Sequence, residues 1–298
     1  MNFFNHLKQN RFQYCILLMI FFFIILRQWE RVHHYVLYAE DGRGFLPRSV
    51  MYGFNAVLRP YTGYLQVAPQ LISLISYYIS LKYYPLITLF ICGFIYSLAI
   101  SSIINSSYSW ICRNQMVRFF IALSLTFIPG TTEILGNLAN LHTILYIFVT
   151  FKMIAKFDAK YSVLDYILFI ITAFSAGEFF LILPVVLYRM FVLYKSKQSL
   201  VCIFQHLLIL LIIVFSIVIN YFTALQAGVM GHKNLIDHIL LLIQYLPHFL
   251  LTISNRIFYL PILGNLTLSI NHYFIIAVIT GVIMILHLRI SCIKTIIL

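Results

Sequence analysis

The sequence predicts an all-α protein, a polytopic bundle of transmembrane helices. Its residues are 62% hydrophobic and only 9% charged, whereas about a quarter of a soluble domain is charged. A backbone inside hydrocarbon must satisfy its own hydrogen bonds, which leaves helices or a closed barrel. The apolar residues lie in long unbroken runs, which favour helices because barrel strands alternate. We expect one domain over residues 1–298 with about 8–10 membrane helices.

Apolar runs mark the expected helices in order. They span residues 12–26, 65–81, 85–104, 119–129, 138–151, 163–175, 179–193, 200–222, 236–251 and 272–288. Several are shorter than the roughly 20 residues of a full crossing. Pro69 interrupts the second run and Pro247 the ninth, so we expect these two to lie along the membrane surface or to re-enter.

Basic residues give the expected orientation, because cytoplasmic loops carry an excess of Lys and Arg. Lys8 and Arg11 precede the first run and place the N-terminus in the cytoplasm. Further cytoplasmic edges are marked by Arg113, Arg118, Lys152, Lys156, Lys160, Arg189, Lys195, Lys197, Arg289 and Lys294. The opposite face then receives the first loop, residues 28–64, the turn 130–140 and the segment 223–271.

The first loop contains an acidic pair, Glu40 and Asp41, in a chain with eight carboxylates. The pair is either a solvated turn, with Glu40 a partner for Arg43, or a site where a carboxylate takes a proton or binds a metal. Two adjacent loop residues cannot easily point at one place, so we expect unequal roles. Gly42 gives Asp41 the freedom to act as the base. Glu40 is then its structural or metal-orienting neighbour, bound to an arginine or to backbone amides.

Arginines surround this pair, although the charge rule depletes them on a non-cytoplasmic face. An anionic ligand would explain them. We expect Arg27 and Arg31 to contact lipid head groups. Guanidinium groups offer forked donors suited to phosphate. The candidate phosphate ligands on this face are Arg43, Arg48, Arg59, Lys233 and Arg256.

Further polar residues interrupt the apolar runs on the same face. Pro129 and Gly130 break the chain before a second polar group, whose members face one cavity if they follow helical spacing. These are Glu133, Asn137, Asn140 and His142. The asparagines have an alternative role in holding helices together. Glu178 lies in a small-residue break that is either a plain turn or part of the same cavity. His232 is either an ordinary loop histidine or a substrate ligand.

Several functions lack sequence support. The five cysteines lie within or beside apolar runs, which does not favour disulfides or thiolate metal sites. No HExxH, P-loop or GxSxG motif is present, so we expect no cofactor, and nothing indicates a divalent metal. The net charge of +12 belongs to membrane topology rather than to nucleic acid.

These features together resemble the GT-C superfamily of membrane glycosyltransferases. The resemblance rests on residues 38–45, 59–65 before Pro69, 129–142, and 175–178 before Pro184. More narrowly, the chain is similar to bacterial enzymes that move a sugar from a polyprenyl-phosphate carrier to surface polysaccharide, including the O-antigen-modifying glucosyltransferases of lipopolysaccharide.

The resemblance implies a multi-pass protein of the bacterial inner membrane with a periplasmic active site. Its partners would be membrane lipid, a polyprenyl-phosphate-sugar donor and a polysaccharide or lipid-linked glycan acceptor. The reaction would invert the anomeric carbon, with Asp41 or Glu40 activating the acceptor hydroxyl and basic residues holding the donor phosphate. Two alternatives stay open. One is a flippase or transporter for lipid-linked sugar, and the other a membrane acyltransferase with His142 as base.

Overall fold

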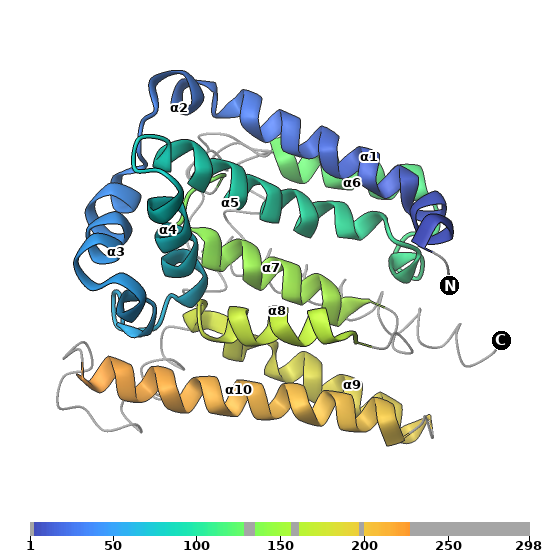
Figure 1. Cartoon of the computed structure of the whole chain (residues 1–298). Helices are drawn as coiled ribbons and strands as arrows, with labels where there is room; N and C mark the ends of the chain where they lie inside the picture. The colour runs from blue at the N-terminus through green and yellow to red at the C-terminus, as the bar shows by residue number, and fades with distance from the viewer. Residues whose placement is uncertain (1–2, 128–134, 156–160, 197–199, 227–298) are drawn as a thin grey trace, which may run out of the picture. The chain divides into compact units, whose positions relative to one another are not determined.

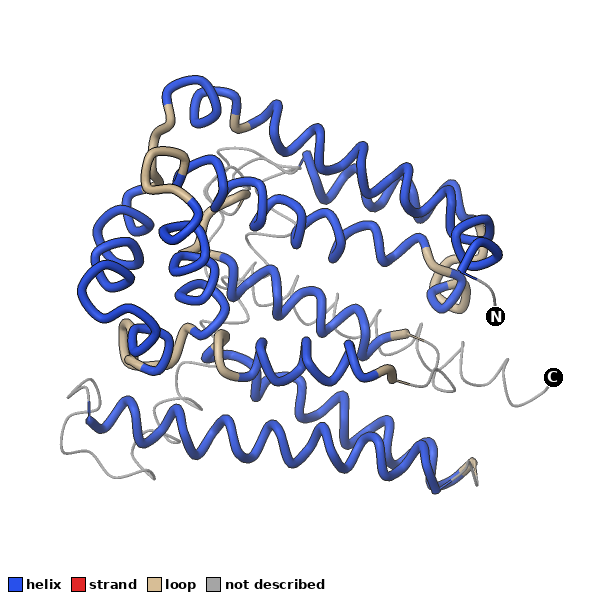
Figure 2. Tube along the Cα trace, in the orientation of Figure 1, coloured by secondary structure: helices blue, strands red, loops and turns tan. Residues whose placement is uncertain are grey.

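A computed structural model of the chain describes residues 3–127, 135–155, 161–196 and 200–226 (Figure 1). All of them belong to one compact unit, residues 1–230. This part is helical and contains no strand (Figure 2), which confirms the all-α prediction for the described residues. The runs 236–251 and 272–288 lie outside the described residues, as do Glu133, His232, Lys233 and Arg256. The expectation of one domain over the whole chain remains a prediction.

Eight of the expected apolar runs form helices. They are α1 (Phe3–Arg27), α4 (Val67–Ile79), α5 (Tyr84–Ser101), α6 (Gln115–Phe127), α7 (Leu141–Ile154), α8 (Val163–Ala173), α9 (Leu183–Lys195) and α10 (Leu200–Gln226). Helix α1 starts nine residues before its run, and the other ends shift by a few residues. Local sequence determines where several of these helices begin. Prolines lie in the first turns of α5 and α9, where a missing N–H costs nothing. Ser162 and Asp165 form a capping box on α8.

The first loop is largely helical, which the polar sequence did not predict. It contains α2 (Trp29–His34), the π-helical turn η1 (Asp41–Phe45), α3 (Leu46–Tyr52) and the 3-10 helix η2 (Gly53–Leu58). Tyr35 ends α2 in the left-handed region, with φ of 53°. Buried Phe45 anchors the loop in a core cluster with Leu138 and Leu141.

The helices α1, α5, α7, α8 and α10 run side by side between two ends (Figure 1). We call one of them the first-loop end; it carries residues 28–66, the 135–140 turn and residues 174–182. Val67 N–H donates to the Phe174 carbonyl there, at 3.1 Å. At the opposite end the chain turns at residues 102–114. The Trp110 indole donates to the Ile154 carbonyl there, at 2.9 Å.

Helix α4 lies across the first-loop end beside α3 (Figure 1). Pro69 stands in its first turn and does not break it. Its 13 residues span about 20 Å, less than the ~30 Å of a hydrocarbon core. The expectation that residues 65–81 do not cross the membrane remains a prediction. Residues expected at cytoplasmic edges, such as Arg113, Arg118 and Lys195, share the opposite end.

Within the described residues, three helical segments are long and apolar enough to cross a membrane: Tyr84–Ile104, Gly177–Lys195 and Leu200–Thr223. Large apolar side chains also remain exposed within the described residues, among them Phe22 on α1, Phe120 on α6 and Phe215 on α10. Contiguous exposed apolar surface of this kind marks contact with lipid or protein. These features indicate a membrane protein.

Candidate active site at the first-loop end

Asp41 is the most completely enclosed carboxylate in the described part of the chain. Its side chain is 0% exposed. Oδ1 accepts hydrogen bonds from the backbone N–H groups of Leu138 (3.0 Å) and Ala139 (3.3 Å). Oδ2 lies 3.7 Å from Nη2 of Arg31. Asp41 therefore joins the first loop to the 135–140 turn, two segments that the sequence analysis treated as separate polar groups.

Arg31 completes the connection from α2. Its Nη1 donates to the carbonyls of Gly136 (2.9 Å) and Leu135 (3.5 Å), and its side chain is 11% exposed. Arg27 donates to the carbonyl of Thr126. The expectation that Arg27 and Arg31 bind lipid head groups is therefore wrong. Both guanidinium groups bind carbonyl oxygens within the protein, in one case at the end of α6 and in the other in a turn, where helical partners are missing.

The 135–140 turn does not have the helical spacing expected for its polar residues. Helix α7 begins only at Leu141. Asn137 is buried, and its Oδ1 accepts a hydrogen bond from the Asn140 backbone N–H at 2.9 Å. Gly136 has φ of 71°, and a Cβ there would lie 2.2 Å from a methyl of Leu89. Only glycine meets both constraints, and so it fixes the path of the turn against α5.

Burial dominates the electrostatics of the Asp41 pair. It raises the pKa of Asp41 to about 6, although the Arg31 cation and the two amide hydrogen bonds oppose the rise. It also lowers the pKa of Arg31, which the Asp41 carboxylate opposes. Desolvation disfavours the charged form of either group. The Asp41 carboxyl group is therefore bound by Arg31 and by two backbone amides and is shielded from solvent.

Glu40, in contrast, is exposed, and its charge acts on half-buried tyrosines nearby. Burial raises the pKa of Tyr64 to about 12, and the carboxylates of Glu178 and then Glu40 add to the rise. The pKa of Tyr61 is likewise raised by burial and then by Glu40. His142 Nε2 lies 3.7 Å from Glu178 Oε1, and its ring stands 6.2 Å from that of Tyr64. We call these five residues the Glu40 group.

The sequence predicted unequal roles for the acidic pair, and the two environments are indeed unequal. The carboxylate bound by an arginine and by backbone amides is Asp41, and the accessible one is Glu40. The expected assignment had Glu40 in the bound position. The reason is local: η1 starts at Asp41, which turns its short side chain toward the 135–140 turn.

The three first-loop phosphate candidates differ in what they contact. Arg48 is engaged, because its Nη2 donates to the carbonyls of Arg59 (2.7 Å) and Pro60 (3.0 Å). Arg59 is exposed and stacks over the Tyr52 ring at 3.8 Å. Arg43 is exposed as well. Arg48 also lies over the Tyr61 ring, 5.6 Å from its centroid.

Buried polar atoms without a hydrogen-bond partner gather at this end. Among the described residues they include Arg31 Nε and Nη2, Asp41 Oδ2, Arg48 Nε, Gln66 Oε1 and His142 Nδ1. Such atoms are rare in folded proteins, and a group of them indicates bound water or a ligand. No group of three or more His, Cys, Asp or Glu side chains in the described residues is placed to hold a metal ion.

Sequence reasoning missed a buried network beneath the loop. Gln70 Nε2 donates to Ser49 Oγ (2.8 Å), Ser49 contacts Ser73 Oγ (2.8 Å), and Ser73 contacts the Tyr84 hydroxyl (2.7 Å). It ties α3 to α4 and α5. The signal was present, because Gln70 and Ser73 are polar residues three apart within an apolar run, which places them on one helix face.

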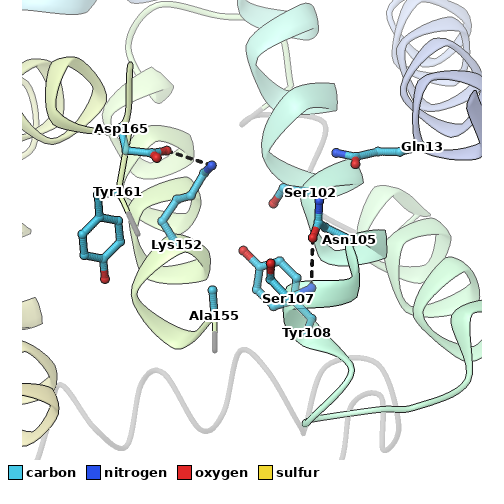
Figure 3. A pocket seen from close by; sticks show the side chains of 9 residues that line it. All are labelled: Gln13, Ser102, Asn105, Ser107, Tyr108, Lys152, Ala155, Tyr161 and Asp165. Atoms are coloured by element: carbon cyan, nitrogen blue, oxygen red, sulfur yellow. Dashed lines mark hydrogen bonds and ion pairs between the residues drawn. The ribbon is translucent and has the colours of Figure 1, made fainter. Parts of the chain in front are cut away.

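A polar cavity lies at the opposite end (Figure 3). It has a volume of about 140 Å³ and is lined by Asn105, Tyr108, Lys152 and Asp165, among others. Lys152 and Asp165 form an ion pair at 2.8 Å. The cavity holds only a few waters at ~30 Å³ each, so it is too small for a lipid-linked sugar.

The comparisons with known proteins give no relatives: no protein-family model, curated protein or solved structure matches this chain. The candidate site therefore stands on its geometry alone.

Proposed function

We propose that the chain is a multi-pass membrane glycosyltransferase of the bacterial inner membrane, with the first-loop end in the periplasm. It transfers a hexose-type sugar from a polyprenyl-phosphate donor to a surface polysaccharide such as O-antigen. The observation that carries the proposal is the gathering of accessible acids, exposed arginines and unsatisfied buried polar atoms around the acidic motif. A transfer site for a charged lipid-linked sugar needs these three elements together.

The carboxylate that accepts the proton must reach the acceptor hydroxyl. Glu40 is exposed, whereas Asp41 is enclosed. We therefore assign the base to Glu40 and make Asp41 its positioning neighbour. Glu40 takes the hydroxyl proton while the acceptor oxygen bonds to the anomeric carbon. The bond from that carbon to the phosphate oxygen breaks, and lipid phosphate leaves with the electron pair, which inverts the configuration.

The remaining residues take supporting roles. Exposed Arg43 and Arg59 are suited to hold the donor phosphate. Arg48, bound to backbone carbonyls, shapes the loop instead. Glu178 and His142 offer polar contacts to sugar hydroxyls. Lys233 and Arg256 remain candidate phosphate ligands, and Glu133 and His232 candidate cavity residues; all four lie outside the described residues.

One contact favours a second candidate, a membrane acyltransferase. His142 Nε2 faces Glu178 at 3.7 Å, and a histidine oriented by a carboxylate is a common general base. An acyl donor in place of the sugar donor, in the same assay, tests this alternative. A flippase, the third hypothesis, would move lipid-linked sugar across the bilayer without transferring it.

The test uses full-length protein in proteoliposomes with a polyprenyl-phosphate-hexose donor and polysaccharide from cells that lack the protein. Glu40→Gln should lower the transfer rate by roughly 10²- to 10⁴-fold, the usual cost of losing a general base. Glu30→Gln is the matched control, because Glu30 is an acid of the same end, 87% exposed and paired with His34. Equal rates for the two variants would contradict the proposal, as would sugar translocation without transfer.

A further inference from the structure

Arg31 joins three segments that are distant in sequence. It starts from α2, its Nη1 donates to carbonyls in the 135–140 turn, 104 and 105 residues away, and its Nη2 faces Asp41. Asp41 in turn accepts the N–H groups of Leu138 and Ala139. The turn is thus held from both sides, by its carbonyls through Arg31 and by its amides through Asp41.

We propose that Arg31 is a positioning residue of the transfer reaction. It clamps the 135–140 turn onto the acidic motif and so sets the position of Glu40 relative to His142. The inference rests on the proposed function, because positioning has meaning only for a reaction. Arg31 itself is largely enclosed and adjoins Glu40 only through Asp41.

The geometry explains why the clamp matters at both of its ends. Glu40 is the residue directly before Asp41, so a displacement of Asp41 moves it as well. His142 is the second residue of α7, directly after the turn, and it faces Glu178 across to η6 (Gly177–Ile182). Loss of the clamp therefore changes the distance between the two sides of the Glu40 group.

The chemistry requires arginine. A planar guanidinium presents donors in two directions, which allows one side chain to serve carbonyl oxygens and a carboxylate together. A lysine ammonium is a point charge on a flexible chain and cannot keep both contacts in one fixed geometry. Arg31→Lys should therefore lower kcat almost as much as Arg31→Gln, although it retains the charge.

The first readout is kinetic. A misplacement of about 1 Å costs on the order of 10²-fold in rate, so Arg31→Gln should lower kcat by about that factor and change the donor KM less than about twofold. Arg27→Gln is the control, since Arg27 lies four residues earlier, at the end of α1, and binds the Thr126 carbonyl.

The second readout does not depend on activity. Ala139 is 6% exposed in the clamped turn, so a cysteine placed there in a cysteine-free background should react slowly with a thiol reagent. We expect the reaction to become about tenfold faster or more with Arg31→Gln, as a local opening free energy falls by about 1.4 kcal/mol or more, and to change little with Arg27→Gln. Arg31→Lys provides the same comparison if Arg31→Gln does not accumulate.

The outcomes separate the two proposals. Faster labelling in a protein that transfers no sugar would overturn the proposed function and leave the clamp standing. Unchanged labelling and unchanged kcat in the Arg31 variants would overturn the clamp, whatever the function. An equal fall in kcat for the Arg27 and Arg31 variants would also contradict it, because the effect would then be a general loss of structure.

Discussion

Arg189 and Arg31 are both buried arginines, at opposite ends of the same helices, and their hydrogen bonding differs. Arg189, 2% exposed, donates to the carbonyls of Met153 (2.5 Å) and Ala155 (2.7 Å) and to His206 Nε2 (3.0 Å). His206 Nδ1 contacts the Cys202 carbonyl at 2.8 Å. Arg31 leaves Nε and Nη2 without a hydrogen bond, opposite the equally unsatisfied Oδ2 of Asp41.

The difference shows which buried charges satisfy the ends of helices and which do not. The last carbonyls of a helix have no intrahelical partner. Arg189 supplies donors to those of α7, and Arg118 does the same for Ile104 and neighbouring carbonyls. Arg189 therefore closes the end of α7. At the first-loop end Arg31 and Asp41 keep buried polar atoms without a hydrogen bond. Arg118 Nε is likewise unsatisfied at the opposite end, so the contrast is between Arg189 and Arg31 and not between all the charges of the two ends.

The largest expected effect tests whether the two ends face different compartments. A cysteine at exposed Asn55, in a cysteine-free background, should react with a membrane-impermeant thiol reagent in cells with a permeabilised outer membrane. A cysteine at exposed Ser106, at the opposite end, should react only after the inner membrane is lysed. Ser49 is 1% exposed and unsuitable. The reverse pattern would invert the topology and remove the periplasmic site.

The next effect separates structural from ligand-binding arginines. Arg189→Ala leaves buried carbonyls and His206 without a charged donor, so the free energy of unfolding should fall by about 3 kcal/mol or more. Exposed Arg59, stacked on Tyr52, contributes less than about 1 kcal/mol. Arg59→Ala should instead lower the apparent affinity for the polyprenyl-phosphate donor about tenfold.

Thermal unfolding in detergent and a donor titration measure the two quantities. If Arg59→Ala were as destabilising as Arg189→Ala, the distinction between the two ends would not hold. Arg43→Ala extends the donor titration to the second exposed arginine. If neither Arg59→Ala nor Arg43→Ala changed the apparent donor affinity, the phosphate site would lie elsewhere.

The smallest effect concerns the pH dependence of Asp41. Its pKa rises from 3.8 to about 6 on folding, so the folded chain binds this proton more tightly than the unfolded chain. This contribution to stability is fully present below a pH of about 3.8 and is lost as pH rises through about 6. Wild type should therefore gain on the order of 1 kcal/mol relative to Asp41→Asn between about pH 7.5 and about pH 5.

Thermal unfolding of wild type, Asp41→Asn and Glu40→Gln at the two pH values checks this result. Glu40 is exposed, so Glu40→Gln should keep the wild-type pH dependence. A constant difference between wild type and Asp41→Asn across this pH range would show that the carboxylate is not held as the structure describes. It would also weaken the comparison between the two ends.

The sequence by itself determined the class of the fold and most of its helices. The length of the apolar runs identified α1, α5 and α10. Both the hydrophobic length of a segment and the hydrogen bonds that a helix makes within itself depend only on local sequence. The sequence also singled out Glu40 and Asp41, since acids are scarce in an apolar chain. The in-plane position of residues 65–81, argued from charge alternation, remains a prediction.

Only the tertiary structure decided how the polar groups pair. Asp41 and Leu138 are 97 residues apart, and no periodicity links positions so distant in the chain. For the same reason, sequence reasoning assigned Arg31 to lipid head groups and exchanged the environments of Glu40 and Asp41. Hydrogen bonds to backbone carbonyls and amides depend on where the chain turns, not on residue type. A charge pattern therefore selected the candidate site, and three-dimensional contacts determined which of its charges are bound within the protein and which are exposed.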